Sequence, residues 1–448
     1  MTRDPWPAPF ASTRIDASVC LPGSKSLTAR YLVLAALADS PSHLSGALIS
    51  RDTQLMIAGL AALGARIDVD DAGPHPSAQG TDPLGRPPLP GTDQSGHGPG
   101  LTVAPAPIAG PARIETGLAG TVMRFLPPVA ALAREPVEFD GDPAARRRPM
   151  GPLIEALRAL GVRVEDDGRG RLPFAVHGIG GVEHHCVGVD ASASSQFLSA
   201  LLLAAPALGG LDVTAPGPVP SAPHVQMTLA ALRQFGAHAE PIPNGWRVGG
   251  RLGGRDVRIE PDLSNAAPFL AAGVVTAGRV TAVDWPSTTV QPGDLLREFL
   301  AAMGADVSWT PDGLTVLGPD RPRGVDLDLG AAGELAPTLA AIAAVATTPS
   351  RLTGIGHLRG HETDRLAALT REINRLGGRA RELPDGLEIV PAPLHGGAVE
   401  TYGDHRMATF AAVIGLVVPG VTIRDVATTA KTLPDFPERW TAMVNGPW

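Results

Sequence analysis

The sequence predicts an α/β protein with two similar domains, each built from three related units. Its 448 residues exceed what one hydrophobic core usually supports, so two domains are expected. Six segments rich in Ala and Leu recur along the chain, each opened by a short polar cluster, and this repetition predicts six copies of one unit. Aromatic residues make up only 4% of the chain, so we expect cores of Ala, Leu and Val in small helices packed closely on sheets.

The recurring segments define the register of the repeat. Equivalent positions in the last four segments lie 70 residues apart, at Ser195, Asn265, Leu335 and His405, and the first two are marked by Ser26 and Thr121, 95 residues apart. Each segment is expected to form a helix, within residues 24–38, 119–133, 192–208, 262–278, 333–348 and 403–418.

A second helix follows in most copies and ends at a glycine. Apolar residues at i, i+3, i+4 and i+7 before that glycine are typical of an amphipathic helix with its C-terminal cap. Alternating residues with PNG or PDG turns come next and predict β-hairpins. Each unit is therefore expected to run strand, helix, strand, helix, hairpin, with residues 431–444 replacing the full second helix in the last unit. The helix ends lie within 60–69, 154–165, 229–240, 297–309 and 370–382.

The domain boundaries follow from this count of units. Residues 21–248 are expected to form the N-terminal domain, and residues 1–20 with 249–448 the C-terminal domain. The strand near the N-terminus is assigned to the second domain because it precedes the first unit and leaves one strand without a partner. Residues 71–100, rich in Gly, Pro and Asp without apolar periodicity, are expected to form an inserted surface loop, with a partner-binding segment as the alternative.

Composition excludes several classes of function. A net charge of −8 makes the chain a poor candidate for binding nucleic acid or an anionic membrane. Its two cysteines, Cys20 and Cys186, are too few for a disulfide framework or a zinc site. The first residues lack the apolar core of a signal peptide, and no apolar run reaches the ~18 residues of a membrane span. We therefore expect a soluble protein of the cytoplasm.

The polar clusters that open the six segments predict an anion-binding site. Backbone N–H groups and the positive end of the helix dipole point at whatever lies before a helix. For one helix alone, capping by Ser, Thr or Asp is a sufficient explanation. The clusters also carry Lys25, Arg30, Arg124, His405 and Arg406, however, and such a set favours one shared site for anions.

Other polar clusters have simpler alternatives. LPGSKS (21–26) lacks the spacing of a phosphate-binding loop. RRRP (146–149) is compatible with a solvated run of charge, and Glu362 with Arg365 is compatible with a salt bridge at a helix start. Glu334 is compatible with an acid favoured by the helix dipole.

Six motifs taken together resemble the 5-enolpyruvylshikimate-3-phosphate synthase family. They are LPGSKSLTAR, AGTVMR, ASSQF, HETDR, GDHRMA and TAKTLPDF, in the family's order over about residues 20–440. The resemblance implies a two-domain inverse α/β barrel of six βαβαββ units, three per domain, that closes on its substrates. It implies transfer of the enolpyruvyl group of phosphoenolpyruvate to the 5-hydroxyl of shikimate 3-phosphate, a step of aromatic amino acid biosynthesis, by a monomer that needs no metal or cofactor.

The resemblance also implies roles for individual residues. Glu334 lies at the position of the family's carboxylate base and Glu362 at that of its proton donor, a role that Lys25 could share. The residues implied for shikimate 3-phosphate are Lys25, Ser26, Arg30, Ser194, Ser195, Gln196, Ser221, Glu334 and His361. Those implied for phosphoenolpyruvate are Lys25, Gly120, Arg124, Arg146, Gln196, Arg365, Arg406 and Lys431.

Several positions depart from the family's commonest pattern. Leu118 and His357 each replace an Asn, His224 a Tyr, His361 a Lys and Glu334 an Asp. We expect His361 to make the binding of shikimate 3-phosphate pH-dependent near neutrality.

Two rivals remain at this point. One is the related transferase that uses UDP-N-acetylglucosamine, although that family carries a loop cysteine and residues 134–148 contain none. The other is a catalytically silent anion-binding relative, against which the retained Lys, Arg and Glu residues argue.

Overall fold

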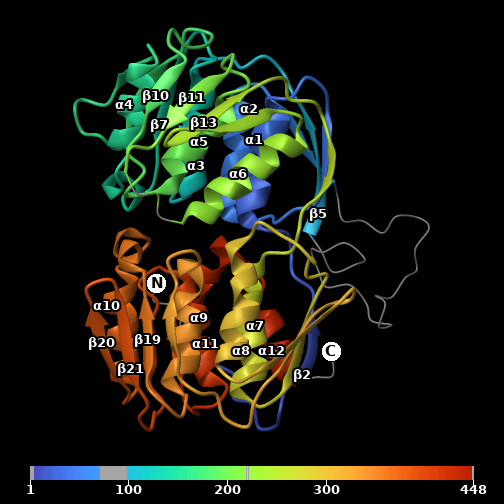
Figure 1. The fold of residues 1–448 in the computed structure, drawn as a ribbon, viewed down its shortest axis with the longest axis vertical. Helices are drawn as coiled ribbons and strands as arrows, with labels where there is room; N and C mark the ends of the chain where they lie inside the picture. The colour runs from blue at the N-terminus through green and yellow to red at the C-terminus, as the bar shows by residue number, and fades with distance from the viewer. Residues whose placement is uncertain (1–4, 71–97, 218, 220, 446–448) are drawn as a thin grey trace.

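The chain forms two bodies, one above the other in Figure 1. The computed structural model describes residues 5–70, 98–217, 219 and 221–445. One apolar core is made of residues between Leu27 and Ile259, and the other joins Ile15–Leu21 to residues between Leu263 and Met443. Each body therefore has a core of its own, as expected for two domains.

The first body carries three four-stranded sheets of one topology. In each sheet the first two strands are parallel and the remaining pairings are antiparallel. In order across each sheet, the strands are β14 (Asp256–Arg258), β3 (Ser42–Gly46), β5 (Gly98–Ala104) and β4 (Arg66–Val69); β6 (Ala112–Glu115), β7 (Pro136–Asp140), β9 (Phe174–His177) and β8 (Arg163–Glu165); and β10 (Cys186–Gly188), β11 (Leu211–Thr214), β13 (Gly245–Gly249) and β12 (His238–Ile242).

The second body repeats this topology twice and ends with a smaller sheet. In the smaller sheet, a short strand from the N-terminus pairs antiparallel with β23 and takes the place of the hairpin. The strands are β16 (Asp306–Thr310), β17 (Gly313–Leu317), β15 (Arg279–Val283) and β2 (Asp16–Val19); β18 (Asp326–Asp328), β19 (Ser350–Thr353), β21 (Gly386–Val390) and β20 (Arg379–Leu383); and β1 (Trp6–Pro7), β23 (Thr422–Arg424) and β22 (Ala398–Glu400).

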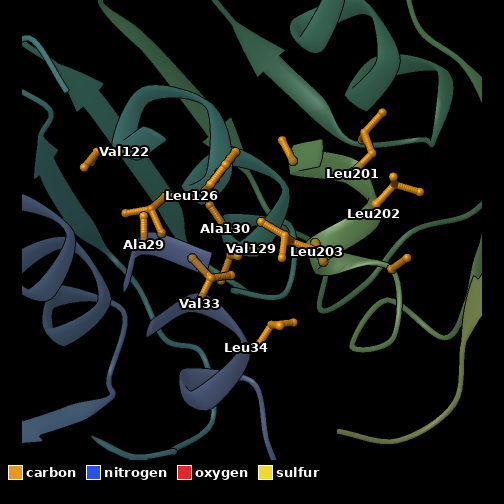
Figure 2. Packing of buried hydrophobic residues seen from close by; sticks show 14 of the residues in the cluster. Ala29, Val33, Leu34, Val122, Leu126, Val129, Ala130, Leu201, Leu202 and Leu203 are labelled. Carbon is orange, nitrogen blue, oxygen red and sulfur yellow. The ribbon is translucent and has the colours of Figure 1, made fainter. Parts of the chain in front are cut away.

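The first helix of each unit lies inside its body. These helices are α1 (Lys25–Ala36), α3 (Gly120–Ala130) and α5 (Ser195–Ala204) in the first body, and α7 (Leu263–Val275), α9 (Ala336–Ala344) and α11 (His405–Gly415) in the second. Every residue of α9 and of α11 is buried, as expected for helices that are apolar all round. The three helices of each body pack against one another. Figure 2 shows this in the first body, where Ala29 and Val33 of α1 lie among the side chains of α3 and α5.

The second helix of each unit is less deeply buried. These helices are α2 (Arg51–Ala62), α4 (Gly151–Ala159), α6 (Ala222–Gln234), α8 (Leu296–Ala302), α10 (Arg365–Arg375) and α12 (Phe436–Asn445). The short 3-10 helices are η1 (Ala145–Arg147), η2 (Pro292–Leu295), η3 (Gly333–Leu335), η4 (Gly356–Gly360) and η5 (Val426–Lys431). With helices inside and sheets outside, the expected inverse α/β arrangement of six repeated units is confirmed.

The bodies exchange one strand each, and this moves a predicted boundary. Strand β2 precedes α1 in sequence, but it pairs in parallel with β15 of the second body. The first unit therefore lacks its own first strand, and β14 supplies it by pairing in parallel with β3. The boundary expected at 248/249 is wrong for this reason, because Val257 and Ile259 belong to the first core and the chain crosses only at about 260–262.

The two crossings run side by side. The backbone N–H of Ser24 donates to the Glu260 carbonyl at 2.7 Å, and the N–H of Asp262 donates to the Pro22 carbonyl at 3.0 Å. Between them, a Cβ on Gly23 would lie 2.3 Å from the carbonyl oxygen of Gly46. Only glycine fits so close an approach of backbones. The two bodies are thus joined by one paired connection.

Two further expectations concern the inserted loop and membranes. Most of the loop expected at 71–100 falls outside the described residues, but 98–100 belong to β5 rather than to a loop. Among the residues that the structure describes, no helix has the length and apolarity to cross a membrane.

Candidate active site

One cleft collects the starts of all six inner helices. Residues at or just before each start line it, including Asp262 and Ser264 at α7, for which the sequence suggested no ligand role. The lining includes fifteen of the sixteen predicted site residues: Lys25, Ser26, Arg30, Gly120, Arg124, Ser194, Ser195, Gln196, Ser221, Glu334, His361, Glu362, Arg365, Arg406 and Lys431. Since both bodies contribute, the complete site requires both.

The exception is Arg146, and Arg148 lines the cleft in its place. The Arg146 side chain is 50% exposed and donates twice to Asp140, at 2.9 and 2.7 Å. Helix η1 ends just before Arg148, whose backbone is extended (φ −77°, ψ 137°). An extended conformation is the one that the following proline favours, so Pro149 was a signal that could have distinguished the three arginines.

The start of α1 is held by two carboxylates. Ser24 caps the helix, and the backbone N–H of Lys25 donates to Asp262 at 3.0 Å. The ammonium of Lys25 lies 3.3 Å from the carboxylate of Asp52, a buried residue in the first turn of α2 that the sequence reasoning missed. Asp52 also lines the cleft, so Lys25 is fixed at both its backbone and its side chain.

Arg30 is a buried cation within the first body. Its Nε donates to Thr228 at 2.8 Å, and its two terminal nitrogens donate to the carbonyls of Ser26 and His224 at 2.9 and 3.0 Å. Burial lowers its pKa to about 10, which still leaves it charged at neutral pH. These bonds fix the guanidinium at the wall of the cleft.

Arg124 and Arg148 present unsatisfied nitrogens. Arg124 donates to the Gln196 side chain at 2.9 Å, and its guanidinium lies 5.2 Å from the centre of the Phe197 ring. The buried Nε atoms of Arg124 and Arg148 have no hydrogen-bond partner within the described parts of the chain. Buried donors are normally paired, so these two nitrogens point to an anionic ligand.

The second body contributes a cluster of paired charges. Asp404 caps α11, is fully buried and accepts from Arg365 at 2.7 Å. Glu362 accepts from Arg365 at 2.9 Å and from the ammonium of Lys431. Arg406 donates to the carbonyl of Ser264 at 2.7 Å. The helix-start salt bridge between Glu362 and Arg365 thus exists, but within a larger cluster that faces the cleft.

The two candidate catalytic carboxylates have opposite pKa shifts. Burial raises the pKa of Glu334 above its ordinary value, because it outweighs a backbone hydrogen bond and the charge of Arg406. Burial acts in the same direction on Glu362, but Lys431 and Arg365 outweigh it and hold its pKa well below the ordinary value. One acid is therefore the better proton acceptor, and the other is a carboxylate held by cations.

Four histidines line the same cleft: His224, His357, His361 and His405. The rings of His357 and His361 lie 5.7 Å apart, edge to face. Burial, followed by nearby arginines, lowers the pKa of both His224 and His361 to about 3. The imidazole of His361 is therefore neutral at pH 7, and the pH-dependent binding expected from this residue stays a prediction.

Fold and site together define a class of protein. Two bodies of repeated units enclose a cleft that is lined by cations and by two carboxylates. This combination of fold and site is that of a transferase with an inverse α/β barrel and anionic substrates. Solved structures with this fold include the EPSP synthase of Acinetobacter baumannii (TM-score 0.76, 23% identity, 96% of each chain covered) and the enolpyruvyl transferase NikO of Streptomyces tendae (TM-score 0.69, 19% identity, 96% of this chain and 95% of that one).

The sequence comparisons identify the family. Residues 10–81 and 98–440 match the family model of EPSP synthase (3-phosphoshikimate 1-carboxyvinyltransferase). A 3-phosphoshikimate 1-carboxyvinyltransferase of Kocuria rhizophila is 54% identical over 451 aligned positions, which cover 98% of this chain and 97% of the relative. The chain belongs to the EPSP synthase family.

Proposed function

We propose that this cleft transfers the enolpyruvyl group of phosphoenolpyruvate to the 5-hydroxyl of shikimate 3-phosphate and releases inorganic phosphate. The observation that carries the proposal is the meeting, in one cleft, of cations from both bodies with Glu334 and Glu362. Both substrates are anionic, and arginine is well suited to clamp carboxylate and phosphate groups. Family membership supports the same reaction.

The acceptor side is assigned to the residues around α1, α5, α6 and η4. The neutral imidazole of His361 would form a hydrogen bond with shikimate 3-phosphate, whereas a lysine at this position would add a positive charge. The full set proposed for shikimate 3-phosphate is Lys25, Ser26, Arg30, Ser194, Ser195, Gln196, Ser221, Glu334 and His361.

The donor side is assigned to the arginine-rich part of the cleft. We assign Arg148 rather than Arg146 to this side, because Arg148 lines the cleft and its buried Nε has no hydrogen-bond partner among the described residues. The full set proposed for phosphoenolpyruvate is Lys25, Gly120, Arg124, Arg148, Gln196, Arg365, Arg406 and Lys431.

The reaction needs one base and one acid. Glu334 would take the proton of the 5-hydroxyl group as the hydroxyl oxygen attacks the enol carbon. The raised pKa of Glu334 makes this carboxylate a stronger base. Glu362, with Lys25 nearby, would deliver a proton to the methylene carbon, which becomes a methyl group. The resulting ketal then loses phosphate, with cleavage of the C–O bond, while the methyl group returns a proton and the double bond re-forms.

Phosphate release with two acceptors tests the proposal. Phosphoenolpyruvate with shikimate 3-phosphate should release phosphate in proportion to enzyme, and with UDP-N-acetylglucosamine it should not. Release only with UDP-N-acetylglucosamine would assign the chain to the related transferase. A folded protein that releases phosphate with neither acceptor would be a silent anion-binding relative.

We also propose that the protein acts as a monomer in the cytoplasm. The described residues of one chain bring together the cations, Glu334 and Glu362, so the proposed chemistry does not require a second copy. Light scattering should give a mass near 46.1 kDa, and a concentration-independent mass of twice that value would contradict the monomer.

A further inference from the structure

Glu362 lies in the cleft as an anion among the groups proposed to hold phosphoenolpyruvate. Both of its oxygens are occupied: one faces the Nζ of Lys431, and the other lies 2.9 Å from Nη2 of Arg365. Its side chain is 11% exposed and lines the cleft. Two of the proposed phosphoenolpyruvate ligands are thus already paired within the protein.

The neighbouring carboxylate has a different role. Asp404 caps α11, accepts the backbone N–H of Arg406 at 2.9 Å and is fully buried. Moving it would break a helix start. Glu362, in contrast, lies between the end of η4 and the start of α10 and caps neither helix. Lys431 and Arg365 can therefore exchange Glu362 for another anion, while Asp404 keeps Arg365 in place.

We propose that Glu362 occupies the place of an anionic group of phosphoenolpyruvate, and that the substrate displaces it from Lys431 and Arg365 and leaves it protonated. The step is a balanced one, because the carboxylate takes one proton from solvent and becomes a carboxylic acid. The binding of phosphoenolpyruvate would thus convert Glu362 into the acid that donates a proton to the methylene carbon. The inference rests on the proposed function.

The direction in which the pKa of Glu362 changes on binding follows from the groups that face this residue. Lys431 of η5 and Arg365 of α10 are its charged partners, with His361 beside it, His405 on α11 and Arg124 across the cleft. Burial by itself raises the pKa of Glu362, and Lys431 and Arg365, followed by His405 and His361, hold it low. An incoming phosphate and carboxylate share those cations and add negative charge nearby. Both effects disfavour the carboxylate form, so the pKa rises.

Calorimetry measures the proton directly. The probe is 2-phospholactate, which carries the phosphate and carboxylate of the substrate but has no double bond to react. It is titrated at pH 7 into the protein saturated with shikimate 3-phosphate, in two buffers that differ in ionisation enthalpy. Conversion of the Glu362 carboxylate to the acid predicts net uptake of up to about one proton per ligand bound.

Two variants test whether Glu362 is the group that takes up this proton. Glu362→Gln should abolish the uptake and bind the probe on the order of threefold to tenfold more tightly, because a competing anion is gone. Glu298→Gln, the same change at an exposed glutamate outside the lining of the cleft, is the matched control and should keep the uptake. Either no uptake by the native protein or equal uptake by a folded Glu362→Gln variant would overturn the inference. A native enzyme that turns over without such uptake would overturn this inference but not the proposed function, which the phosphate-release assay tests separately.

Discussion

Replacing Arg148 by alanine should weaken the use of phosphoenolpyruvate, whereas the same change at Arg146 should not. Arg148 lines the cleft, is held by the Leu118 carbonyl at 3.3 Å and keeps a buried Nε without an acceptor in the described part of the chain. Arg146 is two residues earlier, half exposed, and occupied by Asp140. The pair therefore separates a ligand-binding arginine from a surface one of the same chemistry.

The magnitude follows from the bond that is lost. A hydrogen bond to a charged group contributes about 1.5–3 kcal/mol, which corresponds to a loss of roughly 10- to 150-fold in kcat/KM for phosphoenolpyruvate. Arg146→Ala removes only an exposed ion pair, and such pairs contribute little. We expect kcat/KM within about twofold of the native value for that variant, a difference too small to indicate a lost ligand contact.

Initial rates of phosphate release at varied phosphoenolpyruvate provide the assay, with thermal melting of each variant to check folding. Three results bear on the assignment. A loss confined to Arg148→Ala supports it. A larger loss for Arg146→Ala, or an unchanged kcat/KM for a folded Arg148→Ala protein, would refute the placement of Arg148 on the substrate.

Three further outcomes are expected. Glu334→Ala should lower kcat by roughly 100-fold or more with a much smaller change in the Kd of shikimate 3-phosphate, and equal losses in both would remove Glu334 as the base. His224 and His361 have pKa values of about 3 in the folded protein, so the free energy of unfolding should fall as the pH drops below 6.5, by about 2 kcal/mol for each histidine at pH 5. An unchanged urea midpoint between pH 7 and pH 5 would contradict the burial of these histidines in their neutral form. Gly23→Ala should lower Tm, because its Cβ would lie 2.3 Å from the Gly46 carbonyl and relieving the clash costs about 1–3 kcal/mol; a native Tm would show that the crossings can separate freely.

The sequence predicted the inner helices well because their composition leaves one solution. After its first turn, α11 is apolar on every face except at Thr409, and only the inside of a body can bury such a helix completely. The polar starts of these segments then had to face a common space. The starts of all six segments line one cleft, including Asp262 and Ser264 at α7.

The sequence placed the N-terminal strand in the second domain, but it did not show that β14 then pairs with β3 in the first body. The local sequence pattern of β14 is the same whether this strand joins the second body or pairs with β3. Its place is decided by β2, which pairs with β15 and so leaves β3 without a parallel partner of its own unit. The pKa shifts were equally hidden. Glu334 and Glu362 read alike as acids near helix starts, but one is buried with little compensation and the other is held by two cations.

The central claim is an addition followed by an elimination in the cleft shared by the two bodies. Mass spectrometry of the product formed in D₂O tests it most directly. The account predicts shikimate 3-phosphate enlarged by one enolpyruvyl group, with deuterium in its methylene carbon, because that carbon passes through a methyl group. An enolpyruvyl product without deuterium would contradict the protonation at carbon, and no product from a folded enzyme would contradict the transfer itself.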